Sequence, residues 1–459
     1  MRRIGLWLFI FLGLNLVYSD TLFLTLEKAI NLALANNRLI AQTKEKVKEA
    51  MAGKGIALGA LLPQMSLSGT YYRLDRVSKF SMVFPRYENL PLPVIDPTTG
   101  ETIGFTPPIP MIVGGDTFGM ELGVRNNYLL RGTIQQTLFT WGKLYNAYRI
   151  AGLSLDMEKE NLRATEGAVK VSVVEGFYQA FLAQKTLELL TESKEQLQRH
   201  WERVKRLYEK GLASRLDLLR TEVKLAEVET SVLRMKNNRQ LALNSLLLSL
   251  GLDLETPVFL SVELDSNPVR IDLATAEKMA QEKRPEIQQL RSAIKITRLG
   301  KEIALTSNLP TLFSQLNYDY KKPLGLENKW GTDWNLTLGF QMPFFTGFSN
   351  YNRIKQAQAR ERQAKIALAL LEEGIKLEVS SLVNTLNQEW ENIALQKKNL
   401  RLAEEALSLA EKSYEAGLIT NLEYLDSQIA LASSQISYWS SLANYQIVWA
   451  KLKRAMGEF

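Results

Sequence analysis

Two stretches of this sequence share one pattern and decide the fold: Tyr208-Glu-Lys-Gly-Leu-Ala-Ser-Arg-Leu-Asp-Leu-Leu219 and Tyr414-Glu-Ala-Gly-Leu-Ile-Thr-Asn-Leu-Glu-Tyr-Leu425. In each stretch a glycine, Gly211 or Gly417, suits the left-handed backbone position just past the end of a helix. Three residues later stands Ser214 or Thr420, both of them N-cap residues, and an acidic residue three positions further on completes a capping box. Both stretches are therefore predicted to be tight turns between two helices.

The two turns belong to an internal duplication. Leu62-Pro63 matches Leu309-Pro310 at an offset of 247 residues, whereas Gly142 matches Gly347 at an offset of 205. The difference between these offsets, 247 and 205, places 42 extra residues in the first half, roughly between residues 74 and 118. Because this insertion is dense in proline and glycine, a long irregular loop is predicted there.

The sequence divides into four parts. Residues 1–19 have the charged, apolar and small-residue regions of a secretory signal, for which a short N-terminal anchor helix is the alternative. Residues 20–251 form the first structural repeat, which contains a helix, two strands separated by the long loop at about 74–118, a long helix to the tip at Gly211, and a returning helix. Residues 252–271 are a linker, and residues 272–459 form the second repeat with its tip at Gly417.

Four segments alternate between apolar and polar side chains with period two, which predicts strands. Trp334, Leu336 and Leu338 point one way and Asn335 and Thr337 the other; the remaining segments are 65–71, 128–138 and 312–320. Their lengths suit tilted transmembrane strands of about 9–11 residues. An open sheet edge leaves backbone groups unsatisfied in lipid, so if these strands cross a membrane, several copies must share one barrel.

The rest of the mature chain is predicted to be helical. The stretches from Gly142 to Gly211 and from Gly347 to Gly417 contain no proline, and about 70 residues at ~1.5 Å each would extend ~105 Å. Apolar residues that step by three and four, such as Ile375, Val379 and Leu382, or by seven, such as Leu218, Leu225 and Val232, are typical of a coiled-coil seam. Shorter single helices are expected at about 26–61 and 273–307, before each pair of strands. The predicted class is an α+β membrane protein with coiled-coil helices, internally duplicated.

The composition excludes several kinds of chemistry. The 459 residues include no cysteine and one histidine, His200, so disulfides, thiolate metal sites, multi-histidine metal sites and histidine-based triads are excluded. Without the two arginines of the signal the formal charge falls from +7 to +5, and no basic block typical of nucleic-acid binding occurs. We therefore expect no enzyme, no cofactor, no metal and no nucleic acid, and we expect His200 to face solvent.

Each half of the chain has the same order of helices and strands, a Leu-Pro pair at the entry to its first strand, and a Tyr-Glu-x-Gly-Leu tip. In these features the chain resembles the TolC family of outer-membrane efflux proteins. The resemblance implies a homotrimer in which four strands per chain build a shared 12-stranded β-barrel among the outer-membrane lipids. A long α-helical barrel would continue this β-barrel through the periplasm.

As a function, the resemblance implies a passive exit duct of a tripartite efflux or type I secretion system. Its partners would be a periplasmic adaptor (membrane fusion) protein and an inner-membrane pump of RND, ABC or MFS type. Drugs, metal ions and secreted proteins all remain open as cargo. The alternative is a non-channel coiled-coil scaffold of the periplasm, which would have no need for four strands of membrane length.

The resemblance also places a closable entrance at the two tips. By position, Tyr414 is the closing tyrosine, Glu423 and Asp426 are the acidic residues that ring the entrance, and Asp217 is the polar residue of the first tip. The basic residue of the family's closing link falls at Ile419, so that link is missing. Glu423 and Asp217 are equally explained as helix caps, and a solvated coiled-coil face is the alternative for Asp426.

Finally, the resemblance implies that the adaptor docks on the apolar turns at the tips. The alternative is that these side chains only form hydrophobic staples within their own hairpins. The docking residues would be Gly211, Leu212, Ala213, Ser214, Gly417, Leu418, Ile419 and Thr420.

Overall fold

The computed structural model describes residues 22–262 and 271–459. The predicted signal at 1–19 lies outside the described residues, and so do positions 263–270 of the predicted linker. The chain divides into two compact units, and each is described by itself. Among the described residues, the first consists of 22–54, 149–262, 271–301 and 355–459, and the second of 55–148 and 302–354.

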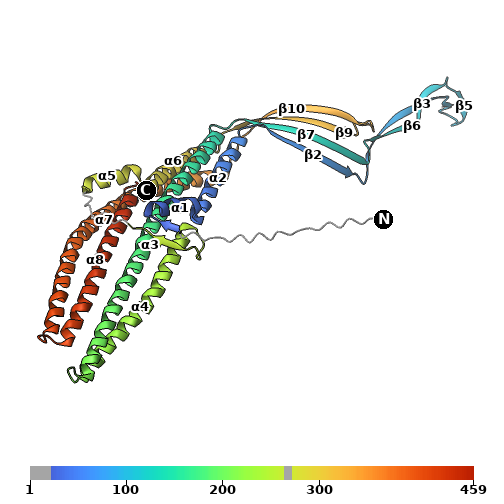
Figure 1. Cartoon of the computed structure of the whole chain (residues 1–459). Helices are drawn as coiled ribbons and strands as arrows, with labels where there is room; N and C mark the ends of the chain where they lie inside the picture. Colours follow the sequence, from blue (N-terminus) through green and yellow to red (C-terminus); the bar gives the residue numbers. More distant parts are fainter. Residues whose placement is uncertain (1–21, 263–270) are drawn as a thin grey trace, which may run out of the picture. The chain divides into compact units, whose positions relative to one another are not determined.

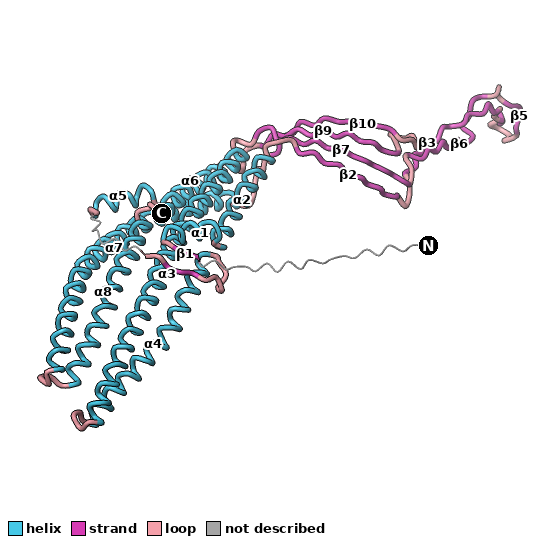
Figure 2. The backbone as a smooth tube through the Cα atoms, in the orientation of Figure 1, coloured by secondary structure: helices cyan, strands magenta, loops and turns pink. Residues whose placement is uncertain are grey.

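The first unit is mainly helical (Figure 2). Its short strands β1 (Leu22–Leu24) and β8 (Val258–Leu260) pair in parallel. The helices that lie in it wholly or in part are α1 (Leu26–Asn36), α2 (Arg38–Gly59), α3 (Lys143–Glu209), α4 (Arg215–Leu250), α5 (Leu273–Lys283), α6 (Pro285–Leu305), α7 (Ser349–Glu415) and α8 (Asn421–Ala455). Among the described helices, none combines the length and the apolar character needed to cross a bilayer.

Two helical hairpins, α3 with α4 and α7 with α8, lie side by side with their turns at the same end (Figure 1). Helices α3 and α7 have 67 residues each, which corresponds to ~100 Å of helix at ~1.5 Å per residue. Their apolar seams are buried: Phe177 and Leu246 belong to one core cluster, and Val379 and Leu452 belong to another. Burial of these seams stabilises the hairpins, as the heptad spacing predicts.

The single helices predicted at about 26–61 and 273–307 are each broken in two, so this prediction is wrong. At the first break the Asn37 side chain accepts a hydrogen bond from the Leu39 N–H at 2.9 Å, and it thereby caps α2. At the second break Pro285 opens α6 and has no backbone N–H with which to continue α5. A capping side chain or a proline therefore outweighs the continuous helical pattern around it.

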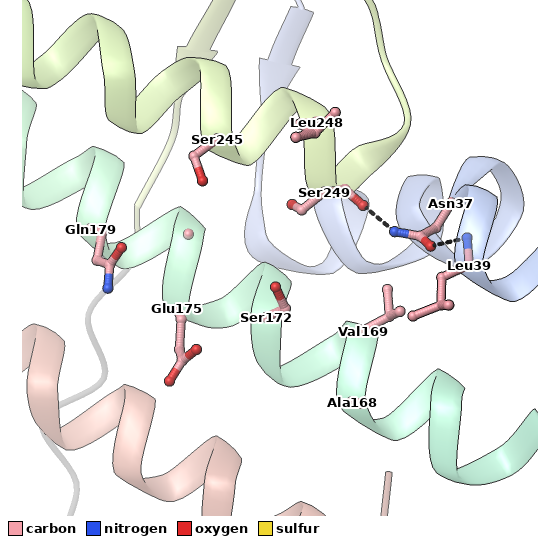
Figure 3. Close-up of a pocket in the computed structure, with 11 residues that line it drawn as sticks. Asn37, Leu39, Ala168, Val169, Ser172, Glu175, Gln179, Ser245, Leu248 and Ser249 are labelled. Carbon is pink, nitrogen blue, oxygen red and sulfur yellow. Dashed lines mark hydrogen bonds between the residues drawn. The ribbon is translucent and has the colours of Figure 1, made fainter. Parts of the chain in front are cut away.

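The first break is docked against the end of α4 (Figure 3). The Asn37 side chain donates to the Ser249 carbonyl at 2.8 Å. Beside this joint lies an open hollow of about 600 Å³, lined mainly by polar and small side chains of α3 and α4 such as Ser172, Glu175 and Ser245. Asn37 thus fixes how α1 and α2 meet the returning helix.

The second unit contains a four-stranded antiparallel sheet in the order β10-β9-β7-β2. The strands are β2 (Gln64–Arg73), β7 (Asn126–Phe139), β9 (Thr311–Lys322) and β10 (Gly331–Gln341). These are the four strands predicted from the period-two alternation, and that prediction is confirmed. Strands β2 and β10 are the two edges of this sheet within one chain.

The long irregular loop predicted at about 74–118 is wrong, because most of this insertion is an extended β-ribbon. Strand β3 (Ser78–Leu90) pairs with β6 (Ile109–Leu122), and β4 (Pro93–Ile95) pairs with β5 (Thr102–Phe105). Each strand of a two-stranded ribbon has one free edge, so it tolerates prolines that a central strand would exclude. The density of proline and glycine therefore indicated unpaired edges rather than an absence of strands.

Candidate functional site at the helix tips and on the sheet

The two predicted turns have the same backbone geometry. Gly211 and Gly417 both have a φ of 72°, in the left-handed region. The N–H of the next residue, Leu212 or Leu418, donates to a carbonyl near the end of the preceding helix at 2.8 Å, as in a Schellman motif. A Cβ at either glycine would meet no atom within 4 Å. The requirement for glycine at both turns thus comes from the backbone angle alone.

The predicted capping box is complete after the second turn, whereas after the first turn only its N-cap half is present. Thr420 forms a complete capping box with Glu423: its hydroxyl accepts from the Glu423 N–H, and the Glu423 carboxylate accepts from the Thr420 N–H at 2.7 Å. The Ser214 hydroxyl likewise accepts from the Asp217 N–H at 3.0 Å. The hydrogen bonds from Thr420, its backbone N–H first, hold the pKa of Glu423 below its usual value. The Glu423 carboxylate is therefore already engaged as a helix cap.

The other tip residues singled out from the sequence differ in exposure. The side chains of Leu212 and Leu418 are 73% and 78% exposed, whereas Ala213 and Ile419 are half-buried. Asp426 is exposed on α8, beyond the turn that Thr420 caps. The leucines thus form the accessible apolar surface of the turns. Helix capping does not explain why an acidic residue stands at the exposed position of Asp426.

Tyr414 lies between the two hairpins instead of in solvent. Its ring stacks on Tyr424 with the ring centroids 5.4 Å apart, and it also contacts the ring of His200. Burial raises the pKa of Tyr414, and the nearby Asp217 carboxylate raises it further because it disfavours the anionic phenolate. The fold therefore brings Tyr414 of the second tip close to Asp217 of the first.

His200 does not face solvent, so that prediction is wrong. It is only 5% exposed, and its Nε2 lies 2.6 Å from Oδ1 of Asn421, the first residue of α8. The spacing of apolar residues in the sequence indicates this burial, because His200 stands three residues after Leu197 and four before Val204, both of which are buried. This spacing of three and four places it on the apolar seam of α3.

Sequence reasoning also missed the polar contacts that join the hairpins near their tips. The Asn421 amide donates to the Thr221 hydroxyl on α4 at 2.9 Å. At the surface, Arg203 on α3 forms an ion pair with Glu415 on α7 at 3.0 Å. Such an exposed ion pair contributes only ~0–1 kcal/mol, so the buried contacts through Asn421 define the junction.

In the sheet, one face is apolar. The register aligns Met65, Ile134, Leu316 and Leu336 across the four strands, and Tyr318 lies opposite Trp334 on the same face. Every one of these side chains is exposed in the single chain, to between 36% and 75%. A continuous exposed apolar face of this kind marks a surface that another apolar phase or protein covers.

The opposite face of the sheet is polar and internally hydrogen-bonded. Arg131 on β7 holds Asp319 on β9 through two hydrogen bonds of 2.7 and 2.8 Å. In the next row, the Thr133 hydroxyl donates to Asn317, whose amide donates to Asn335 at 3.0 Å. The sheet thus has one apolar and one polar face, the pattern of strands that line a water-filled pore.

Within residues 22–262 and 271–459, no group of three or more His, Asp or Glu side chains could hold a metal ion. The hollow beside α4 contains one carboxylate, Glu175, and no histidine. The tips and the two-faced sheet are the candidate functional parts of the chain.

The chain matches known proteins along most of its length. The model of the family described as "Outer membrane efflux protein" matches residues 29–252 and 277–458. The alkaline protease secretion protein AprF of Pseudomonas aeruginosa is 24% identical over 334 residues, which cover 72% of this chain and 69% of AprF. The probable efflux pump outer membrane protein TtgC of Pseudomonas putida is 24% identical over 431 residues, or 89% of this chain and 78% of TtgC.

A similar fold occurs among solved structures. The outer membrane channel CmeC of Campylobacter jejuni superposes with a TM-score of 0.77 at 16% sequence identity, covering 94% of this chain and 85% of CmeC. The family model spans both repeats, including both tips and all four strands of the sheet. This chain is therefore a member of the outer membrane efflux protein family, whose members are channel proteins of the outer membrane.

Proposed function

We propose that three copies of this chain assemble into one channel across the outer membrane, with four strands from each copy closing a 12-stranded barrel. The observation that carries this proposal is the sheet: one face is apolar, the other is polar, and the edge strands β2 and β10 have no further strand partner among the described residues. In lipid an unpaired edge costs several kcal/mol per backbone group, and joining the edges of neighbouring copies removes that cost.

The spacing of aromatic residues supports a membrane position for the sheet. At one end Tyr128 lies between Tyr71 and Trp330, with ring centroids 5.0 and 5.6 Å away. At the other end Phe139 packs on Trp141. From residue 128 to residue 139 the strand rises ~36 Å, which at a tilt of ~40° gives a height of ~28 Å. This is close to the ~25 Å apolar band between the aromatic girdles of outer-membrane barrels.

The experiment that tests this assembly is membrane fractionation followed by electrophoresis of unheated and heated samples. We expect a heat-labile trimer in the outer membrane fraction, because a closed barrel resists detergent until heating opens it. A soluble monomer would instead support the coiled-coil scaffold and refute the channel.

The assembled channel is proposed to be a passive exit duct, driven by an inner-membrane pump that reaches it through a periplasmic adaptor. Relatives named for efflux and for protein secretion support a role in either kind of system. We assign no catalytic step to the chain, because its sole histidine is committed to Asn421 and packed against Tyr414 and Tyr424. The tips then act as the entrance of the duct, with Tyr414 and Asp217 at the contact between hairpins.

Asp426 is proposed to ring this entrance, because it is exposed and has no capping role. Three carboxylates around one axis would attract cations and concentrate multivalent ones. We expect a divalent or trivalent cation to reduce the conductance of wild-type channels in planar bilayers, and Asp426→Asn to weaken that block about tenfold or more. The control is Glu404→Gln, which replaces an exposed acid on α7 instead of α8. Equal block of wild-type and Asp426→Asn channels would remove Asp426 from the entrance.

The exposed turns are proposed as the docking surface for the adaptor. Leu212 and Leu418 are the most exposed apolar side chains there, and burying both against a partner would contribute ~3–6 kcal/mol. We expect Leu212→Asp combined with Leu418→Asp to lose adaptor capture in a pull-down, whereas Leu212→Met with Leu418→Met should retain it. Undiminished capture by the aspartate pair would show that the adaptor binds elsewhere.

A further inference from the structure

The hydrogen bonds around His200 run in one defined direction. The Thr221 hydroxyl donates to the Asp217 carbonyl at 2.8 Å, so its oxygen accepts the bond from the Asn421 amide at 2.9 Å. With its NH₂ group committed in this way, Asn421 presents Oδ1 to Nε2 of His200 at 2.6 Å. The imidazole therefore carries its proton on Nε2 and acts as a donor in its uncharged form.

The surroundings of the ring favour this uncharged form. Tyr424 and Tyr414 lie against the imidazole, with ring centroids 4.6 and 5.3 Å away. Burial lowers the pKa of His200, Arg203 on the same helix lowers it further, and the hydrogen bond to Asn421 opposes both effects. In the described part of the chain, Asn421 is the one hydrogen-bond partner of this ring.

The charged groups of the other helices are placed around the junction, and none is hydrogen-bonded to the ring. On α7, Glu415 is paired with Arg203 at 3.0 Å, and Glu411 lies close enough to raise the pKa of Tyr424 on α8. On α4, the Asp217 carboxylate accepts from the Ser214 hydroxyl at 2.6 Å. Burial raises the pKa values of both Tyr414 and Tyr424, so both phenols stay neutral between pH 5 and 8.

We propose that His200 is an acid-sensitive lock between the two hairpins: uncharged, it holds the start of α8 against α3 and α4, and its protonation favours separation of the tips. This inference rests on the proposed function, in which the tips are the entrance of the channel.

The direction of the pH effect follows from the linkage between protonation and conformation. In the released form His200 is solvated and titrates near its ordinary pKa of about 6.5, whereas in the locked form its pKa is lowered. The released form therefore binds more protons, so the lock has its full strength above about pH 6.5 and weakens as the pH falls below that value. For each unit by which the pKa in the locked form lies below that in the released form, full acidification shifts the equilibrium between the two forms about tenfold toward release. No further shift occurs once the pH is below the pKa of the locked form.

Because His200 is the sole histidine of the chain, its protonation can be read directly. Histidine labelled at the imidazole Cε1 would give the resonance of this one ring in the detergent-solubilised protein, which must be purified with a tag that contains no histidine. We expect a midpoint below 6.5 in the wild type, and a shift toward 6.5 in Tyr424→Ala, which removes a ring that buries the imidazole. A wild-type midpoint at or above 6.5 would overturn the proposal.

The matching functional test is single-channel recording between pH 7.5 and pH 5.5. Acidification should raise the open fraction of wild-type channels several-fold. In His200→Gln, which retains an amide donor at the place of Nε2 but cannot gain a proton, the open fraction should stay at its pH 7.5 value. Arg199→Gln, at an exposed neighbouring position of α3, is the matched control and should behave as the wild type.

The possible outcomes distinguish failure of the proposed channel from failure of the proposed lock. If no variant conducts at any pH, the proposed channel fails. If wild-type and His200→Gln channels conduct and respond equally to acid, the channel stands and the acid-sensitive lock is refuted.

Discussion

Replacing Leu336 with arginine is expected to abolish the heat-labile outer-membrane trimer. Leu336 lies midway along β10, aligned with Leu316, Ile134 and Met65 on the apolar face of the sheet. If that face contacts lipid, an arginine near the bilayer midplane costs ~2–4 kcal/mol per copy, and the symmetric assembly carries this cost three times. The measurement is the amount of trimer in the outer membrane on unheated gels, relative to the unfolded chain.

The neighbouring Thr337 provides a matched control. Its side chain is also exposed, but it lies on the opposite, polar face, where an arginine would remain hydrated. We expect Thr337→Arg to assemble normally and to change only the ion selectivity of the channel. If both variants assembled equally well, the apolar face could not be the lipid-facing surface, and the membrane position of the sheet would have to be abandoned.

Replacing Gly251 with alanine is expected to be the most destabilising single change at a helix end. Gly251 ends α4 with a φ of 71°, and a Cβ there would lie 2.4 Å from the carbonyl oxygen of Asn36. The left-handed conformation costs a non-glycine residue ~1–2 kcal/mol, and contact with rigid backbone adds to this. We expect a total loss of about 3 kcal/mol or more, seen as a lower temperature of thermal unfolding by circular dichroism.

Two other glycines test this explanation. Gly457 follows α8 with a φ of 76°, and a Cβ there would lie 2.8 Å from the carbonyl carbon of Lys283, so Gly457→Ala should behave like Gly251→Ala. Gly211 has nearly the same φ of 72° but open space around it, so Gly211→Ala should cost only the backbone term of ~1–2 kcal/mol. Equal losses at Gly211 and Gly251 would contradict the role of the close approach to α1.

These glycines also show how far the duplication extends. Gly457 and Gly251 are 206 residues apart, the same offset that separates Gly417 from Gly211. Each returning helix thus ends against the short helix that opens its own repeat, α1 in the first half and α5 in the second. The Leu-Pro and tip matches indicated the duplication, but the docking of these helix ends became visible only in the folded chain.

The parts of the site that the sequence predicted correctly are those made by local interactions. The glycine turns and the capping of α4 and α8 depend on residues three to five positions apart. The alternation in β10 likewise depends on nearest neighbours. The predictions that failed concern positions where a neighbour distant in the sequence decides, such as the pairing of β3 with β6 within the expected loop.

The sequence by itself determined the turns, the four strands, the duplication and the family, because helix caps and side-chain alternation act over a few residues. Only the tertiary structure decided which side chains meet between the hairpins. His200 and Asn421 are 221 positions apart, and their contact exists because the coiled-coil seams of α3 and α8 bring both into the same buried junction. Burial and a single partner, which arise only on folding, turn an ordinary helical histidine into the proposed lock.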